Sequence, residues 1–276
     1  MAGNRKAPNM YRMPIHFGPR TGPRRGPDGR TFDGADSPKS TSISVSFITD
    51  PEKLERFLPE GFSLAGEPVV TVTASYMTEI KWLAGRGYNT LGVTFPAIFQ
   101  GEQDTARGPF LTVLWENLTD PIITGREELG FSKIYCELPE PNVLSGEHHA
   151  TASWMGFRFL NLKAFNLTEQ ELGGTSNSVS NIDGLLHYKY MPRTGEWGTA
   201  DIEYACLTPA GNSNAITKYR AVGDGSVAFH QARWEDVPTQ YNIINAFYDL
   251  DILEYRGSSL TRTIGGKDLS DQRILR

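Results

Sequence analysis

One lysine lies in a sequence setting that could turn its amine into a nucleophile. Lys133 belongs to a short predicted strand and is surrounded by Phe131, Ile134 and Tyr135. Strand residues two apart point to the same face, so Lys133 would share a face with Phe131 and Tyr135. If that face is buried, loss of hydration disfavours the charged ammonium and lowers its pKa. An uncharged lysine amine can attack a ketone and form a Schiff base. The alternative is a lysine on the solvent-exposed face of its strand, where most lysines lie.

This chemistry sets a condition on the Lys133 nitrogen, which must be shielded from water and uncharged. A position in bulk water, or a locked ion pair with a carboxylate, would argue against it. Two acidic residues of neighbouring predicted strands, Glu79 and Glu116, are candidate acid–base groups beside an imine, although either could be an ordinary solvated carboxylate. Tyr88 and Trp115 are candidate pocket residues, although aromatic strand residues usually pack in a core.

The segment that must position Lys133 runs from Trp115 to Pro141, between two apolar strands. Asp120-Pro121 and Thr124-Gly125 are predicted to form bends. Residues 125–128 are predicted to form a tight turn or a single helical turn that leads into the Lys133 strand.

Most of the remaining chain is predicted to form short strands separated by turns. Residues 40–48 alternate polar and apolar side chains, and residues 68–80 are dense in β-branched residues. Two short helices are predicted, over 51–58 with Asp50 as N-cap, and over 238–250. Residues 223–226 (GDGS) are typical of a hairpin turn. Because strands do not alternate with long helices, the pattern favours an antiparallel barrel or a sandwich over a parallel α/β fold.

Composition excludes several classes of protein. The 276-residue chain carries a net charge of −5, whereas a nucleic-acid-binding protein would present a basic face. No stretch is long and apolar enough to predict a membrane span or a secretory signal. The two cysteines lack metal-ligand spacing and indicate a reducing, cytoplasmic location. His148 and His149 are expected in a surface loop, and adjacent strand residues would face opposite ways, so no metal site is predicted.

The chain is expected to form one domain. Residues 1–39 are rich in glycine, proline and arginine, and are predicted to be a flexible arm that could wrap a neighbouring subunit. Residues 40–276 form the predicted β domain.

The lysine segment resembles a known motif. GREELGFSKIY at 125–135, preceded by ENLTDPIITGRE, is similar to the lysine motif of the acetoacetate decarboxylase superfamily. PVVTVTASYM with GYNTLGVTFPA, DPEKLERFLPEGFSL and LHYKYMP resemble other segments of that superfamily. The resemblance implies a cone-like antiparallel β-barrel with a few short helices. It also implies that Lys133 forms an imine with a keto acid, with no other cofactor, and that the protein is a homo-oligomer.

The resemblance is incomplete at the positions that tune the reaction. Ile134 stands where the decarboxylases have a second lysine, and Ser132 stands where they have proline. Thr73 and Thr90 match their two pocket glutamates, and Ser40 lies near the match of an arginine thought to receive the substrate carboxylate. These departures indicate a divergent branch of the superfamily that includes aldolases, dehydratases and enzymes of secondary metabolism.

Two residues of the motif are retained, Arg126 and Glu127, and both are candidate catalytic residues with Lys133, Glu79 and Glu116. The candidate substrate-binding residues are Thr73, Tyr88, Thr90, Trp115, Phe131 and Ile134.

The predicted function is that of a Schiff-base-forming lyase, either a decarboxylase or an aldolase or dehydratase. Its substrate would be a small keto acid or a keto-containing metabolite. Two alternatives remain open: a non-catalytic barrel that binds a small molecule, and a cofactor-free isomerase or hydrolase that uses the same cavity.

Overall fold

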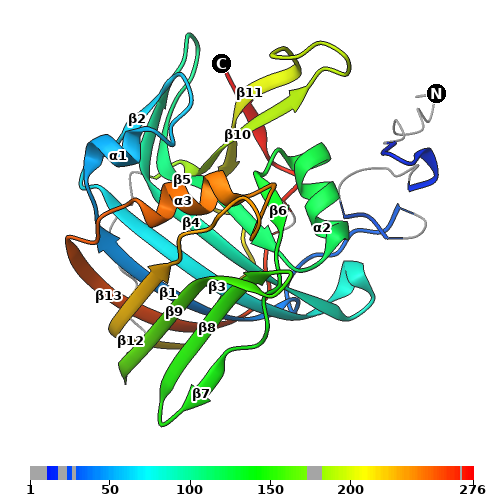
Figure 1. Cartoon of the computed structure of the whole chain (residues 1–276). Coiled ribbons are helices and arrows are strands. Elements are labelled where there is room, and N and C mark those ends of the chain that lie inside the picture. Colours follow the sequence, from blue (N-terminus) through cyan, green and yellow to red (C-terminus); the bar gives the residue numbers. More distant parts are fainter. Residues whose placement is uncertain (1–10, 18–23, 27–28, 173–181, 268) are drawn as a thin grey trace.

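A computed structural model describes residues 11–17, 24–26, 29–172, 182–267 and 269–276 (Figure 1). The strands are β1 Lys39–Ile48, β2 Phe62–Leu64, β3 Val69–Ile80, β4 Arg86–Gln100, β5 Thr105–Glu116, β6 Lys133–Tyr135, β7 Asn142–Leu144, β8 Glu147–Trp154, β9 Phe157–Glu169, β10 Gly184–Pro192, β11 Ala200–Pro209, β12 Ile216–Phe229, β13 Glu254–Ile264 and β14 Arg273–Leu275. The helices are η1 Ile15–Phe17, α1 Pro51–Glu55, η3 Lys81–Leu83, α2 Thr119–Thr124, the π-helical turn η4 Gly125–Leu129 and α3 Tyr241–Tyr248.

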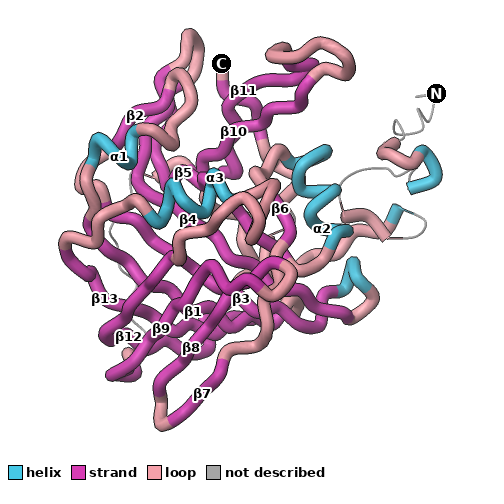
Figure 2. Tube along the Cα trace, viewed as in Figure 1, coloured by secondary structure: helices cyan, strands magenta, loops and turns pink. Residues whose placement is uncertain are grey.

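The strands form one large sheet, and the predicted mainly β fold with a few short helices is confirmed (Figure 2). The order across the sheet is β14-β11-β10-β5-β4-β3-β1-β13-β12-β9-β8-β7, with β2 beside β4 and β6 beside β5. The sheet is mixed, not purely antiparallel as predicted, because β5 pairs in parallel with both β10 and β6. Parallel neighbours need a crossover connection between them. Helices α2 and η4 lie between β5 and β6, and the chain from β6 to β9 lies between β5 and β10.

The sheet curls back on itself. Tyr76 of β3 and His148 of β8 line one cavity, although β1, β13, β12 and β9 lie between their strands. The concave side is filled by the main hydrophobic core, which includes Phe47, Trp115 and Phe159. Burial of this apolar surface is the main favourable contribution to folding.

Two short helices close the core. Asp50 caps α1 by accepting a hydrogen bond from the Glu52 N–H at 2.8 Å, as predicted, and Pro51 occupies the first turn. The ring of Phe57, just after α1, stacks on Phe247 of α3 with centroids 4.8 Å apart. The sequence-predicted helices are therefore both present, although each is shorter than predicted.

Three local predictions were wrong. Residues 223–226 lie within β12 and not in a hairpin turn; a side chain at Gly223 would place its Cβ 2.5 Å from the Phe165 carbonyl oxygen, so glycine permits close strand packing there. His148 and His149 lie in β8 and not in a loop, since their neighbours Ala150 and Ala152 alternate into the core. Residues 119–124 form α2 in place of bends; Pro121 is tolerated because it lies in the first turn of that helix.

The described parts of residues 1–39 contact the β domain. Arg12 pairs with Glu128 of η4, and the Ser37 hydroxyl donates to the Glu79 carbonyl oxygen at 2.7 Å. Residues 1–10, 18–23 and 27–28 of the predicted arm lie outside the described residues, and its flexibility stays a prediction.

Candidate active site

Lys133 lies between the sheet and the α2–η4 segment. It begins β6, where it is paired with Leu114 of β5, and only 2% of the residue is exposed. Its Nζ donates a hydrogen bond to the Pro121 carbonyl oxygen of α2 at 3.1 Å. The Phe131 ring centroid lies 5.5 Å from the same nitrogen. The amine is therefore shielded from bulk water, as the proposed chemistry requires.

The sequence analysis also required that no carboxylate forms an ion pair with the amine, and this requirement is not met. Glu116 Oε1 lies 2.8 Å from Lys133 Nζ, and the two side chains are 1% and 3% exposed. The contact has ion-pair distance but poor hydrogen-bond alignment, so among the described residues neither Glu116 oxygen accepts a well-formed hydrogen bond. Glu116 thus keeps the capacity to bond to a further group beside the amine.

Burial moves both members of this pair toward their uncharged forms. Desolvation lowers the pKa of Lys133, and the attraction of Glu116 opposes that shift. Desolvation likewise raises the pKa of Glu116, opposed by the charge of Lys133. Two buried charges gain little from each other once their lost hydration is counted. Burial therefore favours the uncharged forms of both groups, whereas their mutual attraction favours the charged forms.

Gly125 makes room for the lysine side chain. A Cβ at this position would lie 2.4 Å from Lys133 Cδ and 2.7 Å from its Nζ, so any larger residue would displace the amine. This explains the glycine at the start of the Gly-Arg-Glu stretch.

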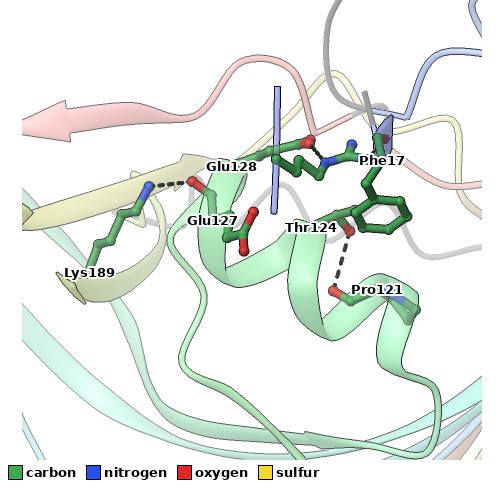
Figure 3. Close-up of polar contacts among 7 residues, drawn as sticks. Phe17, Pro121, Thr124, Glu127, Glu128 and Lys189 are labelled. Atoms are coloured by element: carbon green, nitrogen blue, oxygen red, sulfur yellow. Dashed lines mark hydrogen bonds and ion pairs between the residues drawn. The ribbon is translucent and has the colours of Figure 1, made fainter. Parts of the chain in front are cut away.

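Arg126 and Glu127 support the backbone and do not point at the amine. The Arg126 side chain is exposed and donates through Nη1 to the Lys133 carbonyl oxygen at 2.9 Å. The Glu127 carbonyl oxygen accepts a hydrogen bond from Lys189 Nζ at 2.6 Å (Figure 3). Figure 3 also shows Glu128 on the same helical segment, where it pairs with Arg12. These contacts hold η4 in place beside Lys133.

Phe131 and Tyr135 differ from the predicted strand pattern. The Lys133 N–H donates to the Phe131 carbonyl oxygen at 2.8 Å, which closes a tight turn, so Phe131 precedes the strand and the alternation does not extend to it. Tyr135 is 41% exposed and shares no buried face with Lys133. Ile134 turns the other way and packs against the main core, away from the amine.

The strand residues divide between the two faces of the sheet. Thr90 is paired with Glu116, and directly paired residues share a face, so Thr90 and its i−2 neighbour Tyr88 lie on the Lys133 side. Thr73 lies on the same face, but its hydroxyl bonds to that of Ser44 at 2.9 Å. Burial raises the pKa of Tyr88 to about 12, so it remains a phenol.

Trp115 and Glu79 lie away from the amine. Trp115 points into the concave core and donates through Nε1 to Gln240 Oε1 at 2.8 Å. Glu79 is exposed at the end of β3 and pairs with Lys39 at 2.7 Å. The strand placement of Glu79 was predicted correctly, but its position gives it no contact with Lys133.

His187, which the sequence did not single out, fixes the turn before Lys133. The imidazole is fully buried, with Nδ1 2.9 Å from the Gly130 carbonyl oxygen and Nε2 3.1 Å from Thr208 Oγ1. Its ring stacks on Phe131 with centroids 4.5 Å apart. Burial lowers the pKa of His187 to about 4, so the ring is neutral and donates to Gly130 through Nδ1. A lone histidine in an apolar strand carries no sequence signal for this role.

Arg24, on the N-terminal segment, is a second residue that the sequence did not single out. Its guanidinium carbon lies 5.2 Å from the Trp82 ring centroid, and Trp82 contacts Tyr88 edge-on at 6.3 Å. The positive charge of Arg24 helps to lower the pKa values of both Lys133 and Glu116. Its Nε is buried without a hydrogen-bond partner among the described residues. The site thus contains a cation that no described acidic side chain neutralises.

Other kinds of site find no support in the described part of the chain. Three or more histidine, cysteine, aspartate or glutamate side chains do not gather there in a way that could hold a metal ion. Both cysteines are unpaired and buried. No described helix has the length and apolar character needed to cross a membrane.

Three solved enzyme structures have a fold similar to that of this chain. The enduracididine biosynthesis enzyme MppR, in complex with the condensation product of pyruvate and imidazole 4-carboxaldehyde, aligns with a TM-score of 0.63 at 16% identity over 99% of this chain and 98% of that one. The acetoacetate decarboxylase of Legionella pneumophila aligns with a TM-score of 0.62 at 18% identity, covering 91% and 92% of the two chains. An acetoacetate decarboxylase-like enzyme from Sphingomonas wittichii RW1 aligns with a TM-score of 0.61 at 15% identity, covering 87% and 94%.

These identities are low enough that the alignments show the fold alone, and no curated protein sequence matches the chain. The model of the family described as acetoacetate decarboxylase (ADC) matches residues 12–263, which include the lysine segment and nearly all of the sheet. By this match the chain belongs to the acetoacetate decarboxylase family.

Proposed function

We propose that the protein is a Schiff-base-forming lyase in which Lys133 is the nucleophile and Glu116 transfers protons. The observation that carries the proposal is the buried contact between the two side chains, at 2.8 Å. A neutral amine is needed for attack on a carbonyl, and the neighbouring carboxylate is the group that can remove the ammonium proton.

The reaction divides into three steps. Glu116 takes a proton from Lys133, and the free amine attacks the substrate carbonyl carbon to give a carbinolamine. Glu116, now protonated, donates to the departing hydroxyl, which leaves as water and forms the iminium ion. The iminium then accepts the electron pair of the bond between the α-carbon and the next carbon as that bond breaks. With a β-keto acid this step releases carbon dioxide and leaves an enamine. The same enamine can attack an aldehyde, so carbon–carbon cleavage and aldol-type condensation share this intermediate.

Glu116 would supply the carboxylate that Thr73 and Thr90 cannot provide. Thr73 and Thr90 cannot act as carboxylates, and Ile134 points into the core and supplies no second cation beside the amine. Glu116 lies opposite Thr90 on the next strand, so a carboxyl group reaches nearly the same region from β5. The unsatisfied Glu116 oxygens are available to the hydroxyl of a carbinolamine.

The substrate class that fits this site is a keto compound with a carboxylate. Arg24 is a cation without an acidic partner among the described residues, and an arginine binds carboxylates well because its donors match their geometry. The MppR complex contains a product formed from pyruvate, a keto acid, which agrees with this class. Assembly into a homo-oligomer, a cytoplasmic location and a role in secondary metabolism stay predictions from the sequence.

A covering segment lies over the amine, and substrate entry would need this segment to move. Neither Lys133 nor Glu116 lines any of five cavities formed by the described residues. The segment over the amine is α2–η4, which supplies the Pro121 carbonyl and Gly125.

Borohydride trapping tests the proposal directly. The protein is incubated with pyruvate or acetoacetate and reduced, and peptide mass mapping locates the adduct. An adduct on Lys133 that disappears in Lys133→Arg supports the imine, because arginine cannot form one. Lys163, an exposed lysine of β9, provides the matched control as Lys163→Arg. No adduct on Lys133 with either keto acid contradicts the proposal and favours a binding protein or an enzyme without imine chemistry.

A further inference from the structure

The cavity between Tyr76 of β3 and His148 of β8 lies on the concave side of the sheet. It has a volume of about 540 Å³, within the range of small-molecule sites. Residues of β1, β3, β7, β8, β12 and β13 line it, together with the segment before β7. In Figure 1 these strands run through the lower part of the molecule.

One row of paired residues forms the floor of this cavity. Tyr76 is paired with Thr41, Thr41 with Arg262, and Arg262 with Tyr219, across four neighbouring strands. Directly paired residues share a face and lie about 5 Å apart, so the short Thr41 side chain leaves a gap between Tyr76 and Arg262. The Tyr219 ring, 5.1 Å from the Arg262 guanidinium carbon, holds that group at one side of the gap.

Two buried polar groups at the cavity lack partners. Tyr76 is 5% exposed, and its hydroxyl finds no hydrogen-bond partner among the described residues. The same holds for Nδ1 of His148, on the facing strand β8. Burial raises the pKa of Tyr76, so its hydroxyl keeps its proton and remains a donor. Burial and the charge of Arg262 lower the pKa of His148, and both residues line the cavity. A buried polar group without a partner has lost its hydration without compensation, so a ligand that bonds to it gains affinity.

The charges around the cavity favour an anion. Arg262 and Lys218 have no carboxylate within ion-pair distance among the described residues, whereas Lys39 is neutralised by Glu79. Glu140 is the acidic residue of the lining and offsets one of the two free cations. The remaining lining includes the apolar side chains of Pro141, Val143 and Ile264, which can contact an apolar body attached to the anionic group, together with several serine and threonine residues.

The cavity is separate from the Lys133 site. Glu116 is paired with Thr90, and Thr90 with Ser75, so all three face the Lys133 side of the sheet. Tyr76 follows Ser75 in the same strand and therefore points to the opposite face. A ligand bound against Tyr76 would not contact Lys133.

We propose that this concave-face cavity is a binding site for a small organic carboxylate with an apolar body. Arg262 and Lys218 attract the carboxylate, and the Tyr76 hydroxyl donates a hydrogen bond to it. The apolar side chains of Pro141, Val143 and Ile264 contact the body of the ligand. The site is independent of the proposed lyase reaction.

Calorimetric titration with benzoate tests the proposal, with benzamide and benzylamine as the neutral and cationic analogues. Benzoate is expected to bind, and to bind at least about tenfold more tightly than either analogue, a difference of about 1.4 kcal/mol. Arg262→Gln should weaken benzoate binding about tenfold or more, and Tyr76→Phe should weaken it several-fold. The matched control is Arg220→Gln, which removes one charge from the same region of β12 on the other face and should bind like the parent protein.

Lys133→Met separates this site from the lyase site. Unchanged benzoate affinity in that variant supports a separate site, and lost affinity would place the ligand at Lys133 and overturn the proposal. Absence of benzoate binding to the parent protein, equal binding of benzylamine, or equal losses in the Arg262 and Arg220 variants would overturn it as well.

Discussion

Replacing Glu116 with glutamine should make the stability of the protein depend on pH in a way that the parent protein's stability does not. Between neutral and mildly alkaline pH, the unfolded chain carries one proton on the lysine and none on the glutamate. The native pair also holds one proton, whichever partner carries it, so unfolding of the parent protein takes up no proton at this pair. In Glu116→Gln the attraction that raises the pKa of Lys133 is gone and only burial and Arg24 remain, both of which lower it.

The size of this pH dependence can be worked out from the distance between Lys133 and Glu116. Unit charges 2.8 Å apart attract by about 6 kcal/mol at an effective dielectric constant of about 20, which is an upper bound for this contact. Without this attraction, burial and the charge of Arg24 act unopposed and lower the Lys133 pKa further below its usual range. We expect the native amine of Glu116→Gln to be uncharged over a pH range in which the unfolded lysine is still protonated. The free energy of unfolding should therefore rise by about 1.4 kcal/mol per pH unit, or about 3 kcal/mol from pH ~7 to ~9.

Urea unfolding at several pH values measures this slope. The parent protein, Glu116→Gln and the double variant Glu116→Gln/Lys133→Met are compared, because other titrating groups contribute equally to all three. The extra slope should be present in the single variant and absent from the double variant. Equal slopes in the parent protein and Glu116→Gln would refute the shared-proton description of the pair.

Three further variants test other parts of the site. Gly125→Ala should destabilise the protein by about 1–3 kcal/mol in urea unfolding, because its Cβ would overlap Lys133; unchanged stability would show that the lysine can move aside. Arg24→Gln should raise the pyruvate concentration that half-saturates borohydride trapping about tenfold, but not that of acetone, which lacks a carboxylate; equal effects on both would exclude carboxylate binding by Arg24. His187 is neutral in the native protein and has a pKa of about 4, against 6.5 when unfolded, so about 3 kcal/mol of stability should be lost as the pH falls from 6.5 to 4. His187→Gln should lose correspondingly less over that range, and an equal loss would contradict the assignment.

The sequence was sufficient to predict most of the strands, because they depend on local patterns, and the role of Lys133 stays a prediction. The alternation of residues 40–48 and the capping by Asp50 are properties of neighbouring residues, and both appear in the structure. The position of Lys133 followed from a contiguous motif. The hairpin predicted at residues 223–226 relied on turn-forming residue types and was wrong, because glycine permits close strand packing at Gly223. Phe131 precedes the strand of Lys133, although its ring lies beside the amine.

The partners of Lys133 could not be assigned in the same way, because they come from distant segments. Glu116 and Glu79 had equal standing in the sequence, and only the pairing of β5 with β6 brings one of them to the amine. Arg24 belongs to a glycine- and proline-rich segment with no regular pattern, so nothing local indicates where its side chain lies. His187 bonds to the backbone carbonyl oxygen of Gly130. Every residue has such a carbonyl, so the sequence does not indicate this contact.

The two ends of the sheet constrain how copies of this chain can associate. The outermost strands, β7 and β14, are each three residues long, so they offer few free backbone donors and acceptors to another chain. Short terminal strands of this kind discourage continuation of a sheet from one molecule into the next. Continuation of the sheet through β7 or β14 would therefore add few backbone hydrogen bonds to an assembly of this protein.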